Sequence, residues 1–430
     1  MEQKAKQVHF VGIAGVGMSA LAQLMKDGGV SVTGSDNAWF PTLLAVEKAG
    51  ISVTIGYHED NIPDGTELII HTDAAHPDNV ERQEADRRGI PQQSYFKALG
   101  GVSEGKRTIA VAGTHGKTTT TGMLAKMLKN AGAEPTAVIG SIVKDFGSNY
   151  LHGDSDLFVV EACEYRDHLL ELSPEVLVIT NLEWDHTDYF SSLKTLQDTF
   201  RKAIERVPTH GAIVTDPSNP NIAPLLTAAK ARIVDYTKEP AYVLNLPGEF
   251  NQMNARAAAA AARVILPEIS DTIIYNSAAS FHGTWRRFEY KGKTRNGADV
   301  YDDYAHHPTA VRLTLEALRA KVTGKIIVAF HPHLYSRTRD LLNEFAVAFA
   351  DADQVYIAPI YPAREVDDGS MSSEILAERI RATGTFAMAL DSFDSIERVL
   401  VEVEPNDTII TMGAGDIYKV ADALVAAIKK

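Results

Sequence analysis

Short runs of apolar, often β-branched residues alternate with helix-like segments along almost all of the 430-residue chain. Neighbouring parallel strands need a long crossover connection, which is usually a helix, so this alternation predicts mainly parallel sheets with flanking helices. We therefore expect an α/β fold. Three segments look like new beginnings: VHFVGIAG, RTIAVAGTHGKTT and TWRRFEY. They predict three domains, at residues 1–105, 106–282 and 283–430.

Composition and charge exclude several classes of protein. The formal net charge is −14 and no basic stripe is present, which argues against a nucleic-acid partner or a membrane surface. No run reaches the ~18 apolar residues that span a bilayer, and the N-terminal MEQKAKQ lacks the order of a signal peptide. Cys163 is the single cysteine, which fits a reducing cytosol. We expect a cytoplasmic protein without membrane insertion, either a monomer or a homodimer.

The segment AVAGTHGKTTTTGMLAKML carries the strongest local signal. A strand leads into a glycine-containing turn and a helix leaves it, so successive backbone N–H groups can cradle phosphates. Lys117 can neutralise a transferring phosphoryl group, and the Thr118 hydroxyl can bind Mg²⁺. Val111 stands where the strict phosphate-loop pattern has its first glycine. We expect ATP to contact Gly113, Thr114, His115, Gly116, Lys117, Thr118 and Thr119.

A second glycine-rich turn lies near the N-terminus. Gly12, Gly15 and Gly17 follow the strand-like VHFVGI and precede a helix, which suits a diphosphate at the helix start. Their spacing differs from the dinucleotide fingerprint. Asp36 ends the next expected strand, where an acid commonly meets a ribose hydroxyl. The pattern favours a nucleotide site without fixing the nucleotide, and a tight turn that binds nothing is the alternative.

Acidic residues and a histidine follow two further expected strands. Glu161 and Glu164 end the strand DLFVVE, and Asp185 and His186 end the strand that we expect over VLVITNLEW. Because carboxyl ends of parallel strands share one edge, both groups should lie beside the phosphate loop. Carboxylates suit Mg²⁺, and a histidine can join a second metal site. The alternative is ordinary polar residues at strand ends. Cys163 is interpreted as an inert packed thiol.

Several long runs occur in one order: GTHGKTTT, EACEYRDHLLELSP, TNLEWDHTDYF, FHGTWRRFE, VYDDYAHHPTAV, HPHLYSRTRDLL and IYPARE. Together they resemble the Mur ligase superfamily, and within it the enzymes that add L-alanine to UDP-N-acetylmuramic acid. The resemblance covers nearly the whole chain. It implies a Rossmann-like UDP-sugar domain, a central phosphate-loop ATPase domain and a C-terminal Rossmann-like amino-acid domain. It also implies an acyl-phosphate intermediate, ATP and two Mg²⁺ ions, in peptidoglycan precursor synthesis.

The resemblance assigns roles to individual residues. For the UDP-sugar it implies Gly15, Gly17, Met18, Ser19, Ser35 and Asp36. For ATP it adds Asn251, Asn254, Arg287, Asp303 and His307 to the phosphate loop. For the alanine and muramic-acid end it implies Tyr304, His306, His333 and Arg337, and for metal Thr118, Glu164 and His186. The implied catalytic set is Lys117, Glu164, His186, Arg287 and Asp303. Phe250 is a departure, because the family usually has histidine there.

Other interpretations of the same residues remain open. Arg286 and Arg287 could be a solvated pair on a strand, and Arg337 could pair with Asp340 on the following helix. At the level of function, the rivals are a ligase of the same superfamily that recycles a preformed tripeptide, a non-catalytic nucleotide-binding regulator, and a dehydrogenase. HPHLYSRTRD favours the alanine-adding group over the tripeptide ligase. The glycine spacing and the second phosphate loop oppose a dehydrogenase.

Overall fold

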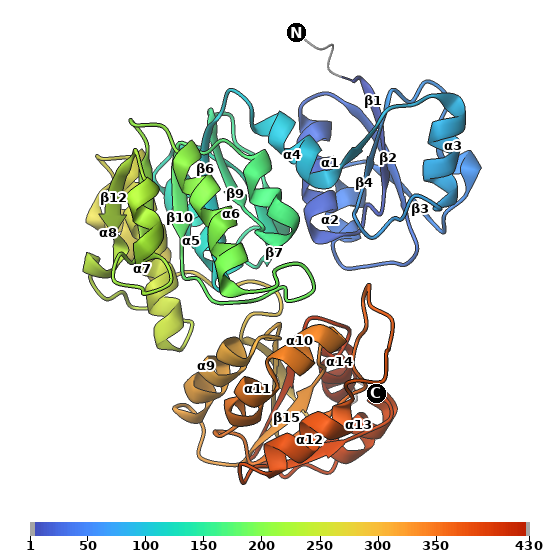
Figure 1. The fold of residues 1–430 in the computed structure, drawn as a ribbon, viewed down its shortest axis with the longest axis vertical. Coiled ribbons are helices and arrows are strands. Elements are labelled where there is room, and N and C mark those ends of the chain that lie inside the picture. The colour runs from blue at the N-terminus through green and yellow to red at the C-terminus, as the bar shows by residue number, and fades with distance from the viewer. Residues whose placement is uncertain (1–4, 427–430) are drawn as a thin grey trace. The chain divides into compact units, whose positions relative to one another are not determined.

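The computed structural model describes residues 5–426; residues 1–4, where the segment MEQKAKQ begins, and residues 427–430 lie outside the described residues. The chain forms two compact units. The first comprises residues 1–182, 196–243 and 253–282, and the second comprises residues 183–195, 244–252 and 283–430. Figure 1 shows helices around each of three sheets. Within residues 5–426, no helix is long and apolar enough to cross a membrane.

The first sheet has the strand order β3-β2-β1-β4-β5, and all its neighbouring strands are parallel. The chain runs from β1 through β2 to β3 on one side of the sheet, and then continues with β4 and β5 on the other side of β1. The connections after β1 and β4 therefore lead in opposite directions at the carboxyl edge of the sheet. Its elements are β1 (Gln7–Val11), α1 (Val16–Asp27), β2 (Ser31–Asp36), α2 (Leu43–Lys48), β3 (Ser52–Ile55), β4 (Leu68–His71), α3 (Val80–Arg88), β5 (Gln92–Ser94) and α4 (Tyr95–Ser103).

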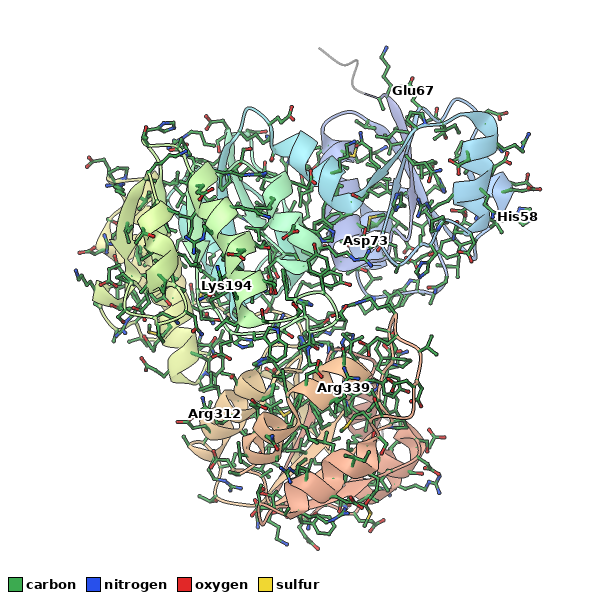
Figure 2. All side chains as sticks on the ribbon, viewed as in Figure 1. His58, Glu67, Asp73, Lys194, Arg312 and Arg339 are labelled. Atoms are coloured by element: carbon green, nitrogen blue, oxygen red, sulfur yellow. The ribbon has the colours of Figure 1, made fainter. Side chains whose placement is uncertain are left out.

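The second sheet has the order β12-β11-β10-β6-β9-β7-β8, parallel except for the hairpin of β7 and β8. Its elements are β6 (Arg107–Ala112), α5 (Lys117–Asn130), β7 (Thr136–Val143), β8 (Ser148–Leu151), β9 (Leu157–Glu161), β10 (Val176–Ile179), α6 (Leu193–Arg206), β11 (Ala212–Thr215), β12 (Arg232–Asp235), α7 (Glu249–Ile265) and α8 (Asp271–Ala279). Asp73, labelled in Figure 2, pairs with Nε2 of His168 at 3.2 Å, which links the loop after β4 to the segment after β9.

The strand that delivers the phosphate loop, β6, lies between β9 and β10. The connection after β6 leads to β7 on one side of the sheet, whereas the connection after β10 leads to β11 on the other. Loops therefore diverge between β6 and β10, which is where open α/β sheets bind ligands. The acidic strand β9 and the strand β10 are thus the two neighbours of the phosphate-loop strand.

The third sheet has the order β13-β14-β18-β15-β16-β17, and only β13 is antiparallel to its neighbour. Its elements are β13 (Glu289–Lys293), β14 (Asp299–Asp303), α9 (Pro308–Arg319), β15 (Ile326–Phe330), α10 (Tyr335–Asp340), α11 (Leu342–Ala348), β16 (Gln354–Ile357), α12 (Ser373–Arg381), β17 (Phe386–Ala389), α13 (Phe393–Leu400), β18 (Thr408–Met412) and α14 (Tyr418–Ala426).

Both faces of the third sheet are buried under helices. Alternate residues of β15 point to opposite faces: Val328 belongs to the core beneath α9, α11 and α12, and Ile327 belongs to the core beneath α13 and α14. This explains why β15, IIVAF, is a continuous apolar run rather than an alternating one. The predicted fold class, three α/β domains with mainly parallel sheets, is confirmed.

Candidate active site

The glycine-rich turn after β1 is shaped by close backbone contacts. Gly12 has φ +85°, and a Cβ atom there would lie 2.4 Å from Cγ2 of Thr72, so only glycine fits. Gly15 is exposed at the end of the turn. The backbone N–H of Ala14 donates to Oδ2 of Asp36 at 2.8 Å. Burial raises the pKa of Asp36, although the hydrogen bond from the backbone N–H of Ala14 opposes this shift. The expected ribose acid therefore also anchors the turn.

The start of α1 is enclosed by side chains. A Cβ atom on Gly17 would lie 2.5 Å from the ring of Tyr95, so this glycine also permits close packing. Met18 and Ser19 are buried, and Nδ2 of Asn149 donates to Oγ of Ser19 at 2.9 Å. The structure thus gathers the residues assigned to the UDP-sugar at one sheet edge, with packing roles for several of them.

Glu81 supports this edge and was missed by the sequence analysis. It accepts hydrogen bonds from Oγ of Ser35 at 2.5 Å and from Nδ2 of Asn61 at 2.6 Å, and lies 3.4 Å from Nε2 of His9. The Glu81 side chain is fully buried. Burial alone would raise the pKa of Glu81, yet the hydrogen bonds from His9, Ser35 and Asn61 lower it. Glu81 was missed because its helix, VERQEADRR, consists mostly of charged residues. Such a pattern indicates a helix exposed to solvent and does not mark one buried acid.

The turn between β6 and α5 has the backbone of a phosphate loop. Gly113 has φ +124°, and a Cβ atom there would lie 2.2 Å from Oγ1 of Thr180. Gly116 has φ +81°, and its Cβ atom would lie 2.2 Å from Oδ1 of Asn254. Neither position tolerates a side chain. The predicted nucleotide residue Asn254 therefore lies directly beside the loop.

Thr180 and Asn181, which follow β10, fix the conformation of this loop. Asn181 accepts from the N–H of His115 at 2.9 Å through Oδ1 and donates to the His115 carbonyl at 3.0 Å through Nδ2. Oγ1 of Thr180 donates to the same carbonyl at 2.6 Å. The N–H of Thr114 donates to the Asn181 carbonyl at 3.2 Å. Both residues were missed as site residues, although they stand within the run TNLEWDHTDYF.

Lys117 and Glu164 form a buried ion pair at the loop. Nζ of Lys117 lies 3.0 Å and 2.9 Å from the two carboxylate oxygens of Glu164, whose side chain is 1% exposed. Nζ also donates to the carbonyls of Gly113 and Thr114. Burial acts to lower the pKa of Lys117, but the negative charge of Glu164 outweighs it and the pKa is raised. Lys117 therefore stays charged, and its ammonium is held at the mouth of the loop.

Two further oxygen donors lie beside this pair. Oγ1 of Thr118 donates to Oε1 of Glu161 at 3.1 Å, and Oε2 of Glu161 accepts from the N–H of Gly140 at 2.7 Å. Hydroxyl and carboxylate oxygens are the donors that Mg²⁺ prefers. The donor set at the start of α5 therefore fits Mg²⁺. Burial raises the pKa of Cys163 to about 12, which agrees with the inert thiol that the sequence predicts.

The expectation that Asp185 and His186 end a strand is wrong. β10 ends at Ile179, and residues 183–195 belong to the second compact unit. His186 has φ +52°, its N–H donates to Oδ1 of Asp185 at 2.6 Å, and its carbonyl accepts from the N–H of Tyr189 at 2.8 Å. A compact turn replaces the strand because local side-chain and backbone hydrogen bonds satisfy the chain there.

This segment is held by α9. Oγ1 of Thr309 donates to Oε2 of Glu183 at 2.6 Å, and Nε2 of His307 lies 3.2 Å from the carbonyl of Trp184. Nδ1 of His307 accepts from the N–H of Thr309, so the same ring caps α9. His307, which the resemblance assigns to ATP, thus also orders the segment that contains His186.

Arg337 forms the centre of a buried polar cluster in the second unit. Its side chain is 1% exposed; Nε donates to Oδ1 of Asp185 at 2.7 Å and Nη1 donates to Nδ1 of His333 at 2.9 Å. Burial lowers the pKa of His333 to about 3, so the ring is neutral and can accept this hydrogen bond. His306 donates through Nδ1 to the Tyr304 carbonyl, and burial also lowers its pKa. The structure brings these predicted residues together.

One sequence-based interpretation of Arg337 is wrong. Arg337 does not pair with Asp340, because Oδ1 of Asp340 accepts from Nε of Arg339, which is labelled in Figure 2. The ion pair of Arg337 is made instead with an acid distant in sequence, which no local pattern indicates.

Arg287 and Asp303 lie close together in the second unit. The guanidinium carbon of Arg287 is 4.8 Å from the ring centre of Tyr304, and the positive charge of Arg287 favours the ionised form of Asp303. Oδ2 of Asp303 accepts from the N–H of Phe288 at 2.6 Å and Oδ1 from the N–H of Ala305 at 2.7 Å. Burial nevertheless raises the pKa of Asp303 to about 6.

The start of α7 carries the other predicted asparagine. Nδ2 of Asn251 donates to the carbonyl of Pro247 at 2.7 Å. Phe250, which stands where the family usually has histidine, packs against the apolar core around α9 that includes Ala317. At this position the chain therefore has apolar packing in place of a polar ring.

Family models match three consecutive stretches of the chain. The Mur ligase family catalytic domain matches residues 7–107, the Mur ligase middle domain residues 111–243, and the Mur ligase glutamate ligase domain residues 286–415. Together they cover most of the sequence.

Curated relatives and solved structures agree with these matches. A UDP-N-acetylmuramate–L-alanine ligase of Clostridium botulinum is 35% identical over 455 residues, covering 99% of this chain and 98% of the relative. The enzyme of that name from Caldanaerobacter subterraneus is 36% identical, covering 100% and 99%. The crystal structure of UDP-N-acetylmuramate–alanine ligase from Thermotoga maritima has a TM-score of 0.80 at 28% identity, covering 98% and 99%. This chain belongs to the Mur ligase family.

Proposed function

We propose that the chain is an ATP-dependent ligase that joins L-alanine to the carboxylate of UDP-N-acetylmuramic acid in peptidoglycan precursor synthesis. The observation that carries the proposal is the convergence of Lys117, Thr118 and Glu164 at a phosphate loop. A non-catalytic nucleotide binder needs no buried lysine–glutamate pair at the transferring phosphate. The full-length relatives named as alanine-adding ligases support this choice of substrates.

We assign one substrate to each of three domains. Residues 1–105 bind the UDP-sugar, residues 106–282 bind ATP and residues 283–430 bind the amino acid. The turn at Gly12 supports the first assignment and the loop at Gly113 the second, because both follow central strands at carboxyl edges. The cluster around Arg337 supports the third.

The reaction has two covalent steps. A carboxylate oxygen of the sugar acid attacks the γ-phosphorus of ATP, ADP leaves, and an acyl phosphate forms. The alanine amine then attacks the acyl carbon, loses a proton and displaces inorganic phosphate. The protein's part is positioning and charge. The Lys117 ammonium stabilises negative charge on the phosphoryl oxygens, and the backbone N–H groups at the start of α5 hold the adjacent phosphates.

The residues at the loop would also hold Mg²⁺. Thr118 supplies a hydroxyl, and Glu161 and Glu164 supply carboxylates from the end of β9. We propose two ions, with Glu164 and His186 serving the second. When bound, Mg²⁺ neutralises phosphate charge and orients the phosphoryl group. A cation at this position would share Glu164 with Lys117, whose ammonium also donates to the carbonyls of Gly113 and Thr114.

The alanine carboxylate is assigned to Arg337. Nε and Nη1 of Arg337 already donate to Asp185 and His333, so the alanine carboxylate would meet the remaining nitrogen, Nη2. The neutral His333 adds no second negative charge beside the guanidinium. The paired Asp185 fixes the orientation of the guanidinium. Tyr304 and His306 complete this end of the site. We propose a cytoplasmic location, where ATP and nucleotide sugars are made, and an assembly that is a monomer or a homodimer.

Phosphate release from ATP tests the proposal. The purified chain is supplied with UDP-N-acetylmuramic acid and either L-alanine or the murein tripeptide. We expect release that requires both the UDP-sugar and alanine. Release with the tripeptide but not with alanine would identify a recycling ligase, and no release with either would indicate a nucleotide-binding regulator.

A further inference from the structure

Arg286 lies at the middle of a tight turn that leads into the third sheet. Arg286 has φ +60° and Phe288 has φ +46°, so two non-glycine residues in three adopt the left-handed conformation. The turn is closed by the N–H of Arg287, which donates to the carbonyl of Thr284 at 3.2 Å. Arg286 is buried, so the interpretation of this pair as solvated residues on a strand is wrong for Arg286. Residues other than glycine rarely adopt this left-handed backbone conformation, so contacts with the surrounding residues must hold the turn.

The guanidinium of Arg286 makes those contacts with all three of its nitrogens. Nε donates to Oδ2 of Asp302 at 2.8 Å, Nη1 to the carbonyl of Gly415 at 2.8 Å and Nη2 to the carbonyl of Gly413 at 2.6 Å. Oδ1 of Asp302 accepts in turn from Oγ1 of Thr411. One side chain therefore joins the turn to the ends of β14 and β18, at the carboxyl edge of the sheet.

The backbone of Arg286 extends the same connection. Its N–H donates to Oε2 of Glu289 at 2.9 Å, and its carbonyl accepts from the N–H of Tyr304 at 2.7 Å. Its guanidinium carbon lies 5.2 Å from the Tyr304 ring centre, and that of Arg287 lies 4.8 Å from the same centre. The Tyr304 ring therefore lies within cation–π distance of both adjacent arginines.

We propose that Arg286 is a positioning residue for the ligase reaction: it holds the turn at residues 284–288 in the conformation that presents Arg287 and Asp303 to ATP. The Phe288 N–H, which donates to Asp303, belongs to the same turn, so loss of the turn would displace both proposed ATP contacts together. The buried pair with Asp302 supports this role, because it fixes the guanidinium of Arg286 to the end of β14. The inference rests on the proposed function for its kinetic readout.

Arg286→Lys keeps the charge and loses the three-way fork. Arg319→Lys is the matched control, because Arg319 likewise joins Gly324, Asp351 and Asp353 at the opposite, amino-terminal edge of the same sheet. We expect Arg286→Lys to lower kcat on the order of 10- to 100-fold and to weaken ATP binding about 10-fold, with the KM for the UDP-sugar unchanged. Arg319→Lys should leave all three values near those of the unmodified protein.

Arg286→Gly separates the backbone from the side chain, because glycine adopts φ +60° without strain. We expect this variant to be as defective as Arg286→Lys, and millimolar ethylguanidinium to restore part of its kcat. Normal kinetics in Arg286→Gly, or equal losses in Arg286→Lys and Arg319→Lys, would overturn the proposal. ATP affinity measured by calorimetry needs no turnover. A failure of the proposed ligase activity in the unmodified protein is therefore distinguishable from a failure of the role of Arg286.

Discussion

At the scale of single residues, Lys117 is proposed to stabilise the transferring phosphoryl group and also forms a buried ion pair. Its ion pair with Glu164 is nearly excluded from solvent. Lys117→Ala should lower the rate of phosphate release on the order of 10²-fold or more, because a preorganised charge is removed from the phosphoryl group. It should also lower the free energy of unfolding by about 3 kcal/mol, because the buried Glu164 carboxylate loses its cation.

The double variant Lys117→Ala/Glu164→Ala separates these two effects. It should recover part of the lost stability in a melting curve but none of the activity. UDP-sugar binding, measured by calorimetry, should survive in both variants, because that ligand is assigned to the first domain. Normal turnover in Lys117→Ala would remove the lysine from the ATP site.

Arg337 has two competing descriptions that one substitution can distinguish. Arg337→Lys cannot serve Asp185 and an incoming carboxylate at once, so we expect the KM for alanine to rise on the order of 10-fold, with little change in the KM for ATP. Arg339→Lys is the control, since Arg339 pairs with Asp340 at the surface of the same helix. A lower melting temperature with an unchanged alanine KM would show that Arg337 is only structural.

The raised pKa of Asp303 leads to a prediction of how activity depends on pH. Burial raises its pKa to about 6, above the value of an exposed aspartate, so the folded state binds this proton more tightly than the unfolded state. Stability from this group is therefore present at low pH and is lost as the pH rises through about 6. Activity should instead rise as the pH rises through about 6, because only the ionised carboxylate of Asp303 attracts Arg287.

We expect kcat/KM for ATP to fall as the pH drops below about 6. Asp303→Asn should be slower throughout and should lack this acidic limb. Steady-state rates between pH 5 and about 8 measure both profiles. An acidic limb of the same shape in the variant would assign the titration to another group.

At the scale of elements, the sequence predicts which strands and helices form but not what holds the loops. The phosphate loop was predicted from Gly113 to Thr118, and the expected strand before it and helix after it are present as β6 and α5. Asn181 and Thr180 were missed because their roles depend on hydrogen bonds between two loops far apart in sequence. The strand assigned up to His186 was too long, because apolar runs indicate a strand without marking where a turn replaces it.

Gly113→Ala tests the loop as an element. The added Cβ atom would lie 2.2 Å from Oγ1 of Thr180, so the loop must move as well as adopt an unfavourable φ. Gly132→Ala is the control, since Gly132 has φ +74° with nothing within 4 Å of its Cβ position. Both should lose about 1 kcal/mol of stability from the backbone. Only Gly113→Ala should weaken ATP binding, by about 10-fold or more in calorimetry, and equal affinities would contradict the loop's geometry.

At the scale of the whole molecule, the proposed site is assembled from stretches far apart in the chain. Lys117 and Arg337 are separated by more than half of the sequence, and the resemblance rather than any spacing rule paired them. Composition and periodicity predict the α/β class because crossover connections require it. They do not predict Glu81 or Arg286, because burial of a charge depends on partners brought in by the fold.

Isotope transfer tests the central claim most directly. UDP-N-acetylmuramic acid with ¹⁸O in both carboxylate oxygens is incubated with the chain, ATP and L-alanine, and the products are measured by mass spectrometry. The proposed reaction moves one labelled oxygen into the released phosphate and leaves the other in the new amide of the alanine product. Unlabelled phosphate, or a labelled sugar acid recovered without alanine attached, would contradict it.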